Sequence, residues 1–249
     1  MRPLIAGNWK MHGLAPQLAE IVAVAASAKA APPFADILIC LPATLITRAA
    51  QAAAGQITIG GEDCSTEVSG AFTGDISAEI LKDAGASAVI VGHSGRRQHH
   101  AETDAIVAAK AKAARHAGLL AIICIGETRS QRLNGNALSV CGDQMAGSIP
   151  DGMIASAMVI GYEPLWAIGS GHMPTSDEIT EMHAHIRQCL VARFGRQGNE
   201  VRILYGGSVK PSNAHEILAL AEVGGALVGG ASLKAGDFEA IFRAVPGMV

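Results

Sequence analysis

The apolar run Ala88-Val89-Ile90-Val91 is followed by an Ala-rich amphipathic stretch, residues 103–116, and then by a second run, Leu120-Ala121-Ile122-Ile123. Both runs are short and continuous rather than alternating in polarity, which is typical of strands covered on both faces. Two such strands joined by a helix pair in parallel, because the crossover returns the chain to the end where the first strand began. The stretch therefore predicts a strand–helix–strand unit of a parallel sheet.

The same unit recurs along the chain. A helix is expected over residues 176–194, where early acids follow a Ser or Thr cap, and another is opened by the Pro-Ser-Asn sequence at 211–213. No linker or low-complexity tract divides the sequence, so we expect one domain over residues 1–249. Eight units close most naturally into a single eight-stranded parallel β/α barrel, with function on the loops that follow the strands. The expected strands are 4–6, 37–40, 57–60, 88–91, 120–123, 158–160, 202–205 and 226–228.

The composition favours this architecture and argues against several classes of partner. Apolar residues make up 49% of the chain and aromatic residues only 4%, as in a core of Ala, Val, Ile and Leu. A net charge of −3 without a long basic run gives no reason to expect nucleic acid or an acidic membrane as partner. We also expect no signal peptide and no membrane span, because strand-like sequence begins at once and no apolar run is long enough.

The cysteines and paired histidines predict neither a cofactor nor a metal. The five cysteines are odd in number and lack a Cys-x-x-Cys pair, so we expect no disulfide framework or zinc site, and a reduced, cytoplasmic setting. His99-His100 and His183-Ala184-His185 lack the His-Glu-x-x-His spacing of a helical metal site, and we interpret them as solvated helix faces.

The most informative loop is GYEPLWAIGSG at residues 161–171, after the sixth expected strand. It begins with a carboxylate, Glu163, continues with an apolar segment that can exclude water, and ends with glycines that can absorb a backbone swing. An alternative interpretation is a capping carboxylate beside an ordinary glycine loop. We predict that Glu163 is a proton-abstracting base under a lid that consists of Pro164, Leu165, Trp166, Ala167, Ile168 and Gly169.

Two other loops supply candidate partners for this base. After the first strand, Lys10 can place an ammonium against a phosphate or a developing oxyanion, and Asn8 can donate a neutral hydrogen bond. After the fourth strand, His93 precedes a helical turn whose positive end disfavours imidazolium, so we expect a neutral ring that polarises a carbonyl. Taken alone, a solvated lysine and a capping histidine are the plainer interpretations.

The loops after the seventh and eighth strands, YGGSV at 205–209 and VGGASL at 228–233, each contain a Gly-Gly turn. Such turns let backbone amides approach an anion closely, and these two loops commonly bind phosphate in barrels. We predict a phosphate cradle made by Ser208, Gly229, Gly230 and, on the closed lid, Gly169. Together with the base and its partners, this cradle predicts proton abstraction beside a carbonyl in a small phosphorylated sugar, through an enediolate.

These segments closely resemble the triosephosphate isomerase family over the whole chain. The resemblance implies a TIM barrel that interconverts dihydroxyacetone phosphate and glyceraldehyde 3-phosphate without a cofactor, in central carbon metabolism. It implies that Glu163 is the base, that His93 is the electrophile, and that Lys10 with Asn8 stabilises the enediolate. The matching strings are AGNWKM (6–11), GAFTG (70–74), VGHS (91–94), CIGE (124–127), the 161–171 loop, YGGSV (205–209) and LVGGASL (227–233).

The resemblance also implies a homodimer, in which the 70–74 loop inserts Thr73 near Asn8 and Lys10 of the neighbouring copy. The uncharged Phe72 at the tip of this loop fits burial in a partner, and a local core contact is the alternative.

Three of the departures from the family pattern bear on function. Gly95 replaces a glutamate that usually lies close to the lysine matching Lys10, and Glu62 stands where glutamine is typical. We hypothesise that Glu62 partly replaces the missing carboxylate, with two unrelated substitutions as the alternative. Leu165, where isoleucine or valine is usual, leaves open a four-carbon substrate such as erythrulose phosphate, and Gly95 leaves open an impaired relative that binds phosphorylated ligands.

Overall fold

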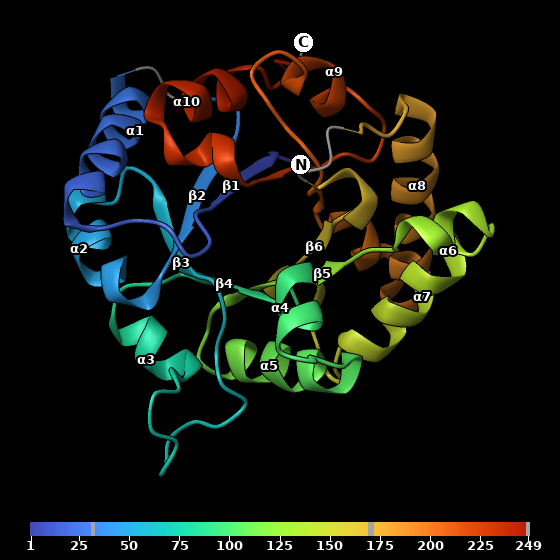
Figure 1. Ribbon diagram of the computed structural model, residues 1–249, viewed down its shortest axis with the longest axis horizontal. Helices are drawn as coiled ribbons and strands as arrows, with labels where there is room; N and C mark the ends of the chain where they lie inside the picture. The colour runs from blue at the N-terminus through green and yellow to red at the C-terminus, as the bar shows by residue number, and fades with distance from the viewer. Residues whose placement is uncertain (31–32, 169–171, 248–249) are drawn as a thin grey trace.

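The computed structural model describes residues 1–30, 33–168 and 172–247. In these residues the chain forms a closed barrel of eight parallel strands, paired in chain order with β8 against β1, and helices surround it (Figure 1). The predicted barrel is confirmed, and every expected strand overlaps an observed one. The strands are β1 (Leu4–Asn8), β2 (Asp36–Leu41), β3 (Thr58–Gly61), β4 (Ala88–Val91), β5 (Leu120–Ile125), β6 (Met158–Tyr162), β7 (Ile203–Tyr205) and β8 (Gly225–Val228).

The helices form the outer layer of the barrel. The expected helix at 176–194 is confirmed, and its cap is Thr175, whose Oγ1 accepts from the Glu178 amide (3.2 Å) while the Glu178 carboxylate accepts from the Thr175 amide (2.8 Å). Among the described residues, no helix is both long and apolar enough to cross a membrane. The α-helices are α1 (Leu18–Ala30), α2 (Ala43–Ala53), α3 (Ala78–Asp83), α4 (Ser94–His99), α5 (Asp104–His116), α6 (Arg129–Leu133), α7 (Ala137–Ser148), α8 (Ser176–Phe194), α9 (Ala214–Leu218) and α10 (Ala235–Arg243).

The strands bury both of their faces, which explains their continuous apolar runs. In β4, Ile90 belongs to a cluster inside the barrel, whereas its neighbours Val89 and Val91 belong to the larger cluster between the strands and the helices. The same alternation in the other strands fills the barrel with side chains. The interior cluster is Leu4, Ala6, Leu38, Cys40, Ala88, Ile90, Ile122, Cys124, Val159, Leu204 and Leu227.

The interpretation of His183 as part of a solvated helix face was wrong. His183 is fully buried on the inner face of α8, with its ring centroid 5.8 Å from that of Tyr162 and 6.4 Å from that of Tyr205. Its Nδ1 lies 3.2 Å from the carbonyl oxygen of Glu222. Burial lowers the pKa of His183 to about 4, so the ring is neutral at neutral pH.

Candidate active site

The base and electrophile candidates are in direct contact. Glu163 directly follows β6, and His93 stands between β4 and α4, so the parallel barrel brings both to the same end. His93 Nε2 lies 2.9 Å from Glu163 Oε1, and both side chains are largely buried. Two residues 70 positions apart in the sequence thus form one hydrogen-bonded pair at the mouth of the barrel.

The start of α4 selects the tautomer of His93. The backbone N–H of Gly95 donates to His93 Nδ1 at 3.1 Å, which requires a lone pair on that nitrogen. In a neutral ring the proton is therefore on Nε2, the nitrogen that faces Glu163. This arrangement fits the predicted role of His93 as a neutral hydrogen-bond donor.

Glu163 is surrounded by donors. Its Oε2 accepts from the Ser94 amide at 2.9 Å, and its Oε1 accepts from the Ser94 hydroxyl at 3.3 Å. Burial raises the pKa of Glu163, but His93, the Ser94 amide and the Lys10 charge outweigh it and hold the pKa below its ordinary value. Glu163 is thus ionised at neutral pH, and its carboxylate must exchange these donors for a substrate proton.

Two glycines, Gly126 and Gly206, permit the conformation at Glu163, a role that was not predicted for either of them from the sequence. A Cβ on Gly126 would lie 1.8 Å from the Glu163 carbonyl oxygen, and one on Gly206 would lie 3.0 Å from its Cγ. Two backbone hydrogen bonds also join the ends of neighbouring strands beside Glu163. The Glu163 amide donates to the Ile125 carbonyl, and the Gly206 amide donates to the Tyr162 carbonyl, each at 2.7 Å. Side chains at 126 and 206 would therefore displace the base.

The lid segment is attached to a buried carboxylate, Glu127. Glu127 Oε1 accepts from Trp166 Nε1 at 2.8 Å and from the Tyr162 hydroxyl at 3.2 Å, and its backbone oxygen accepts from the Leu165 amide at 3.1 Å. No role was predicted for Glu127 from the sequence, although an acid two residues after the fifth strand was the available signal. Pro164 and Ala167 are buried, Leu165, Trp166 and Ile168 are half-buried, and Gly169 lies outside the described residues.

Those predicted phosphate residues that the structure describes share one cavity. Lys10, Ile168, Ser208, Gly229 and Gly230 line a space of about 650 Å³ at the ends of β1, β7 and β8. Lys10 Nζ is 3.6 Å from the position that a Cβ on Gly229 would take, so the ammonium points toward the β8 turn. Gly230 begins the short 3-10 helix η5 (Gly230–Leu233), which places a helix start at this cavity.

Lys10 is held in an unusual backbone conformation. Its φ of 57° lies in the left-handed region, which costs about 1 kcal/mol for a residue with a side chain. Its amide donates to Asn8 Oδ1 at 3.1 Å, so Asn8 supports the strained turn. Asn8, Lys10 and His93 also line a second cavity of about 530 Å³, together with Glu62 and Gly95.

Thr73 is not among the residues that line these cavities within one chain. The segment between β3 and α3 projects from the barrel (Figure 1), and Thr73, which belongs to this segment, is exposed. Phe72 is 49% exposed, so the local core contact considered for it is not observed.

Comparison with known proteins identifies one family. The family model described as triosephosphate isomerase matches residues 3–245. The triosephosphate isomerase of Afipia carboxidovorans is 60% identical over 99% of this chain and 98% of its own, and that of Hyphomonas neptunium is 58% identical over 97% and 98%. The crystal structure of triosephosphate isomerase from Bartonella henselae superposes with a TM-score of 0.92 at 50% identity, covering 98% of this chain and 99% of that one.

Proposed function

We propose, from the premise that this chain belongs to the triosephosphate isomerase family, that Glu163 and His93 are the acid–base pair of its reaction. The enzyme interconverts dihydroxyacetone phosphate and D-glyceraldehyde 3-phosphate by proton transfer through an enediolate. The observation that carries the assignment is the 2.9 Å contact between His93 Nε2 and Glu163 Oε1, with Nδ1 occupied by a backbone N–H. It gives a carboxylate to take a carbon-bound proton and a neutral N–H to face the adjacent oxygen.

Each residue has one step in the proposed mechanism. Glu163 removes a proton from the carbon beside the carbonyl and returns it to the neighbouring carbon, while a proton passes from the hydroxyl oxygen to the former carbonyl oxygen, so that the hydroxyl and carbonyl groups exchange places. The Nε2–H of His93 donates to the oxygen on which negative charge develops, and Lys10 and Asn8 stabilise the same charge. The low pKa of Glu163 supports this assignment, because the base is ionised before substrate arrives.

The phosphate group is proposed to bind in the 650 Å³ cavity. Ser208 and the amides of Gly229 and Gly230 would hold its oxygens, and the ammonium of Lys10 would balance its charge. Residues 164–169 would close over the site and exclude water. Support for this movement comes from Ile168, which lines the same cavity and joins the lid to the phosphate site.

Substitution of the base tests the assignment. We expect Glu163→Gln to lower kcat for glyceraldehyde 3-phosphate by roughly a thousandfold or more, with little change in KM, because only the proton transfer is removed. Steady-state kinetics with circular dichroism would measure this. Glu181→Gln, an exposed carboxylate on α8, is the matched control and should retain parent activity. Unchanged turnover in folded Glu163→Gln would overturn the assignment.

A homodimer is proposed as the working form. The exposed Thr73 and Phe72 on a projecting loop support it, as does the 530 Å³ cavity beside Lys10, which has room for such a loop from a second copy. We also propose one domain over residues 1–249, since β8 pairs with β1 and α10 packs on α1. A cytoplasmic location is proposed because all five cysteines are free.

Neither alternative function is favoured by the comparisons. The relatives described above are named triosephosphate isomerases, at identities of 50% to 60%. No observation on Leu165 or Gly95 supports a four-carbon substrate or an inactive relative.

A further inference from the structure

One arginine of α4 contacts the ends of two neighbouring strands. Arg97 Nε donates to the carbonyl oxygen of Gly92 at 2.9 Å, and Arg97 Nη2 donates to that of Cys124 at 3.1 Å. Gly92 directly follows β4 and precedes His93, whereas Cys124 is the second-last residue of β5. A single guanidinium group thus ties the end of β4 to the end of β5.

Backbone pairing between these strands stops just before this point. Among the described residues, the register of β4 and β5 ends with the pair Val91 and Ile123, and Gly92 then has a φ of 67°, outside the range of a strand. A Cβ on Gly92 would lie 2.7 Å from both methyl carbons of Val107, so the turn requires glycine. Beyond this register, the hydrogen bonds of Arg97 connect the two strand ends.

Two further acceptors hold the guanidinium group of Arg97. Its Nη1 pairs with Asp104 Oδ1 at 2.6 Å, and its Nη2 donates to Ser148 Oγ at 2.8 Å. Ser148 is fully buried, and its hydroxyl also donates to Asp104 Oδ1 at 3.0 Å. Arg97 is therefore fixed by α5 and α7 as well as by the strands, and it does not line the 530 Å³ cavity that is proposed to receive a second copy. Only the planar fork of an arginine suits four such acceptors.

The same two strand ends set the separation of His93 and Glu163. His93 directly follows Gly92, and the Glu163 amide donates at 2.7 Å to the carbonyl of Ile125, the last residue of β5. His93 Nε2 lies 2.9 Å from Glu163 Oε1. A hydrogen bond of that length tolerates little movement, so a shift of one strand end against the other would break the contact.

We propose that Arg97 is a positioning residue, which holds the ring of His93 at its working distance from Glu163 by tying β4 to β5. The proposal rests on the proposed function, in which His93 and Glu163 are the acid–base pair. The hydrogen bonds of Arg97 go to backbone carbonyls, α5 and α7, so its loss acts through the geometry of this pair. Since the proposed phosphate site is made by the loops after β1, β7 and β8, the expected signature is a lower kcat with little change in KM.

The test is Arg97→Lys, which keeps the positive charge beside Asp104 but removes the planar fork. We expect kcat for glyceraldehyde 3-phosphate to fall roughly a hundredfold, the effect of a displacement of about 1 Å, with KM nearly unchanged. Arg193→Lys is the matched control, because Arg193 also donates to two carbonyls, those of Ala146 and Ile149, near the ends of α7 and α8. It should keep the parent kcat and KM.

Proton NMR of the His93 ring gives a readout that a purely structural role would not change. The Nε2–H proton that faces Glu163 should give a downfield signal in the parent and in Arg193→Lys, and His93→Gln identifies this signal by its loss. In Arg97→Lys the signal should move upfield or broaden, because the hydrogen bond to Glu163 lengthens. Circular dichroism would confirm that each variant is folded.

A parent-like kcat, an effect confined to KM, or an unchanged His93 signal in folded Arg97→Lys would overturn the inference. Each of these results leaves the proposed function intact where Glu163→Gln still abolishes turnover. If Arg97→Lys does not fold, Ser148→Ala takes its place in both measurements, since it removes one acceptor but leaves Arg97 present. It should lower kcat by a smaller factor and shift the same signal, and a parent-like result would again overturn the inference.

Discussion

At the scale of single residues, Gly126 controls how closely the loop after β5 approaches the base. An added Cβ would lie 1.8 Å from the Glu163 carbonyl oxygen and 2.7 Å from its carbon, distances that no rotamer change can relieve. The backbone of Glu163 must then move by about 1 Å, and a misplacement of that size costs roughly a hundredfold in rate. We therefore expect Gly126→Ala to fold and to lose about that factor in kcat, measured by steady-state kinetics.

Gly236→Ala is the control for this substitution. Gly236 lies in α10, and a Cβ there meets nothing within 4 Å. The control should keep the parent kcat and gain slightly in stability, since alanine favours a helix. Parent-like kcat in Gly126→Ala would show that the loop after β5 can move without disturbing Glu163.

The hypothesis that Glu62 replaces the carboxylate missing at Gly95 also belongs to the scale of single residues. The structure places both on one cavity with Lys10, which the hypothesis of a replaced carboxylate requires. Burial, however, raises the pKa of Glu62 to about 8, which leaves little negative charge there at pH 7, so a full replacement is not expected. A sequence names both substitutions, but only the surroundings of the carboxyl group determine its ionisation.

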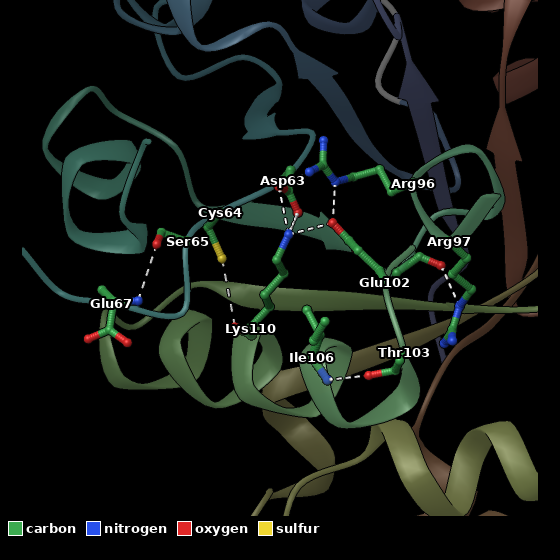
Figure 2. A network of polar contacts seen from close by, with 11 residues as sticks. Asp63, Cys64, Ser65, Glu67, Arg96, Arg97, Glu102, Thr103, Ile106 and Lys110 are labelled. Carbon is green, nitrogen blue, oxygen red and sulfur yellow. Dashed lines mark hydrogen bonds and ion pairs between the residues drawn. The ribbon is translucent and has the colours of Figure 1, made fainter. Parts of the chain in front are cut away.

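At the scale of elements, a buried ion-pair network joins three segments (Figure 2). Lys110 on α5 pairs with Glu102, before that helix, at 2.6 Å and with Asp63, after β3, at 2.7 Å. Arg96 on α4 pairs with the same two carboxylates, at 2.6 Å to Glu102 and 2.9 Å to Asp63. The pKa of Asp63 is raised by burial, whereas at Glu102 the two cations outweigh burial and lower it.

Removal of the central cation should destabilise the fold. Lys110→Met keeps the length of the side chain but leaves Glu102 and Asp63 buried with less positive charge, which costs about 3 kcal/mol in the free energy of unfolding. Urea unfolding at fixed protein concentration would measure the loss. Lys112→Met, an exposed position on the same helix, is the control and should change stability by less than about 0.5 kcal/mol. Equal stabilities would mean that Arg96 alone neutralises both carboxylates.

The elements themselves were largely predictable from the sequence. Strands buried on both faces must be continuously apolar, so 88–91 and 120–123 could be identified without tertiary information. The network of Lys110, Glu102, Asp63 and Arg96 could not be predicted, because it depends on how the loop after β3, helix α4 and the start of α5 pack against one another. Glu127 was missed for the same reason, since its partner Trp166 lies 39 residues away.

At the scale of the whole molecule, the barrel gathers residues that are distant in sequence. Parallel strand order predicted that the loops after β1, β4, β6, β7 and β8 would meet at one end, and Lys10 does share a cavity with Ser208 and Gly229. The direct contact between His93 and Glu163 could not be predicted from the sequence and was found only in the structure. For His183 the prediction was wrong. It was expected on a solvated helix face, but it lies on the side of α8 that packs against the core and is buried.

Burial of neutral His183 makes the stability of the whole fold sensitive to acid. Its pKa is about 4 in the folded protein and near 6.5 when unfolded, so between these values the unfolded chain binds a proton that the folded one does not. The stabilisation is present above pH 6.5 and is lost as pH falls through 4, by up to about 3 kcal/mol. In His183→Asn, whose amide mimics Nδ1, this loss should be absent.

The measurement is urea unfolding of parent and His183→Asn at pH 7, 6, 5 and 4.5, at one protein concentration. The absolute stabilities will differ because asparagine fills less of the space between Tyr162 and Tyr205, but the informative quantity is how that difference changes with pH. We expect the advantage of the parent to shrink steadily as the pH falls. His116→Asn, at an exposed position on α5, should keep a constant difference from the parent. A constant difference for His183→Asn as well would mean that the buried ring is protonated without cost, and that other groups cause the acid sensitivity of the fold.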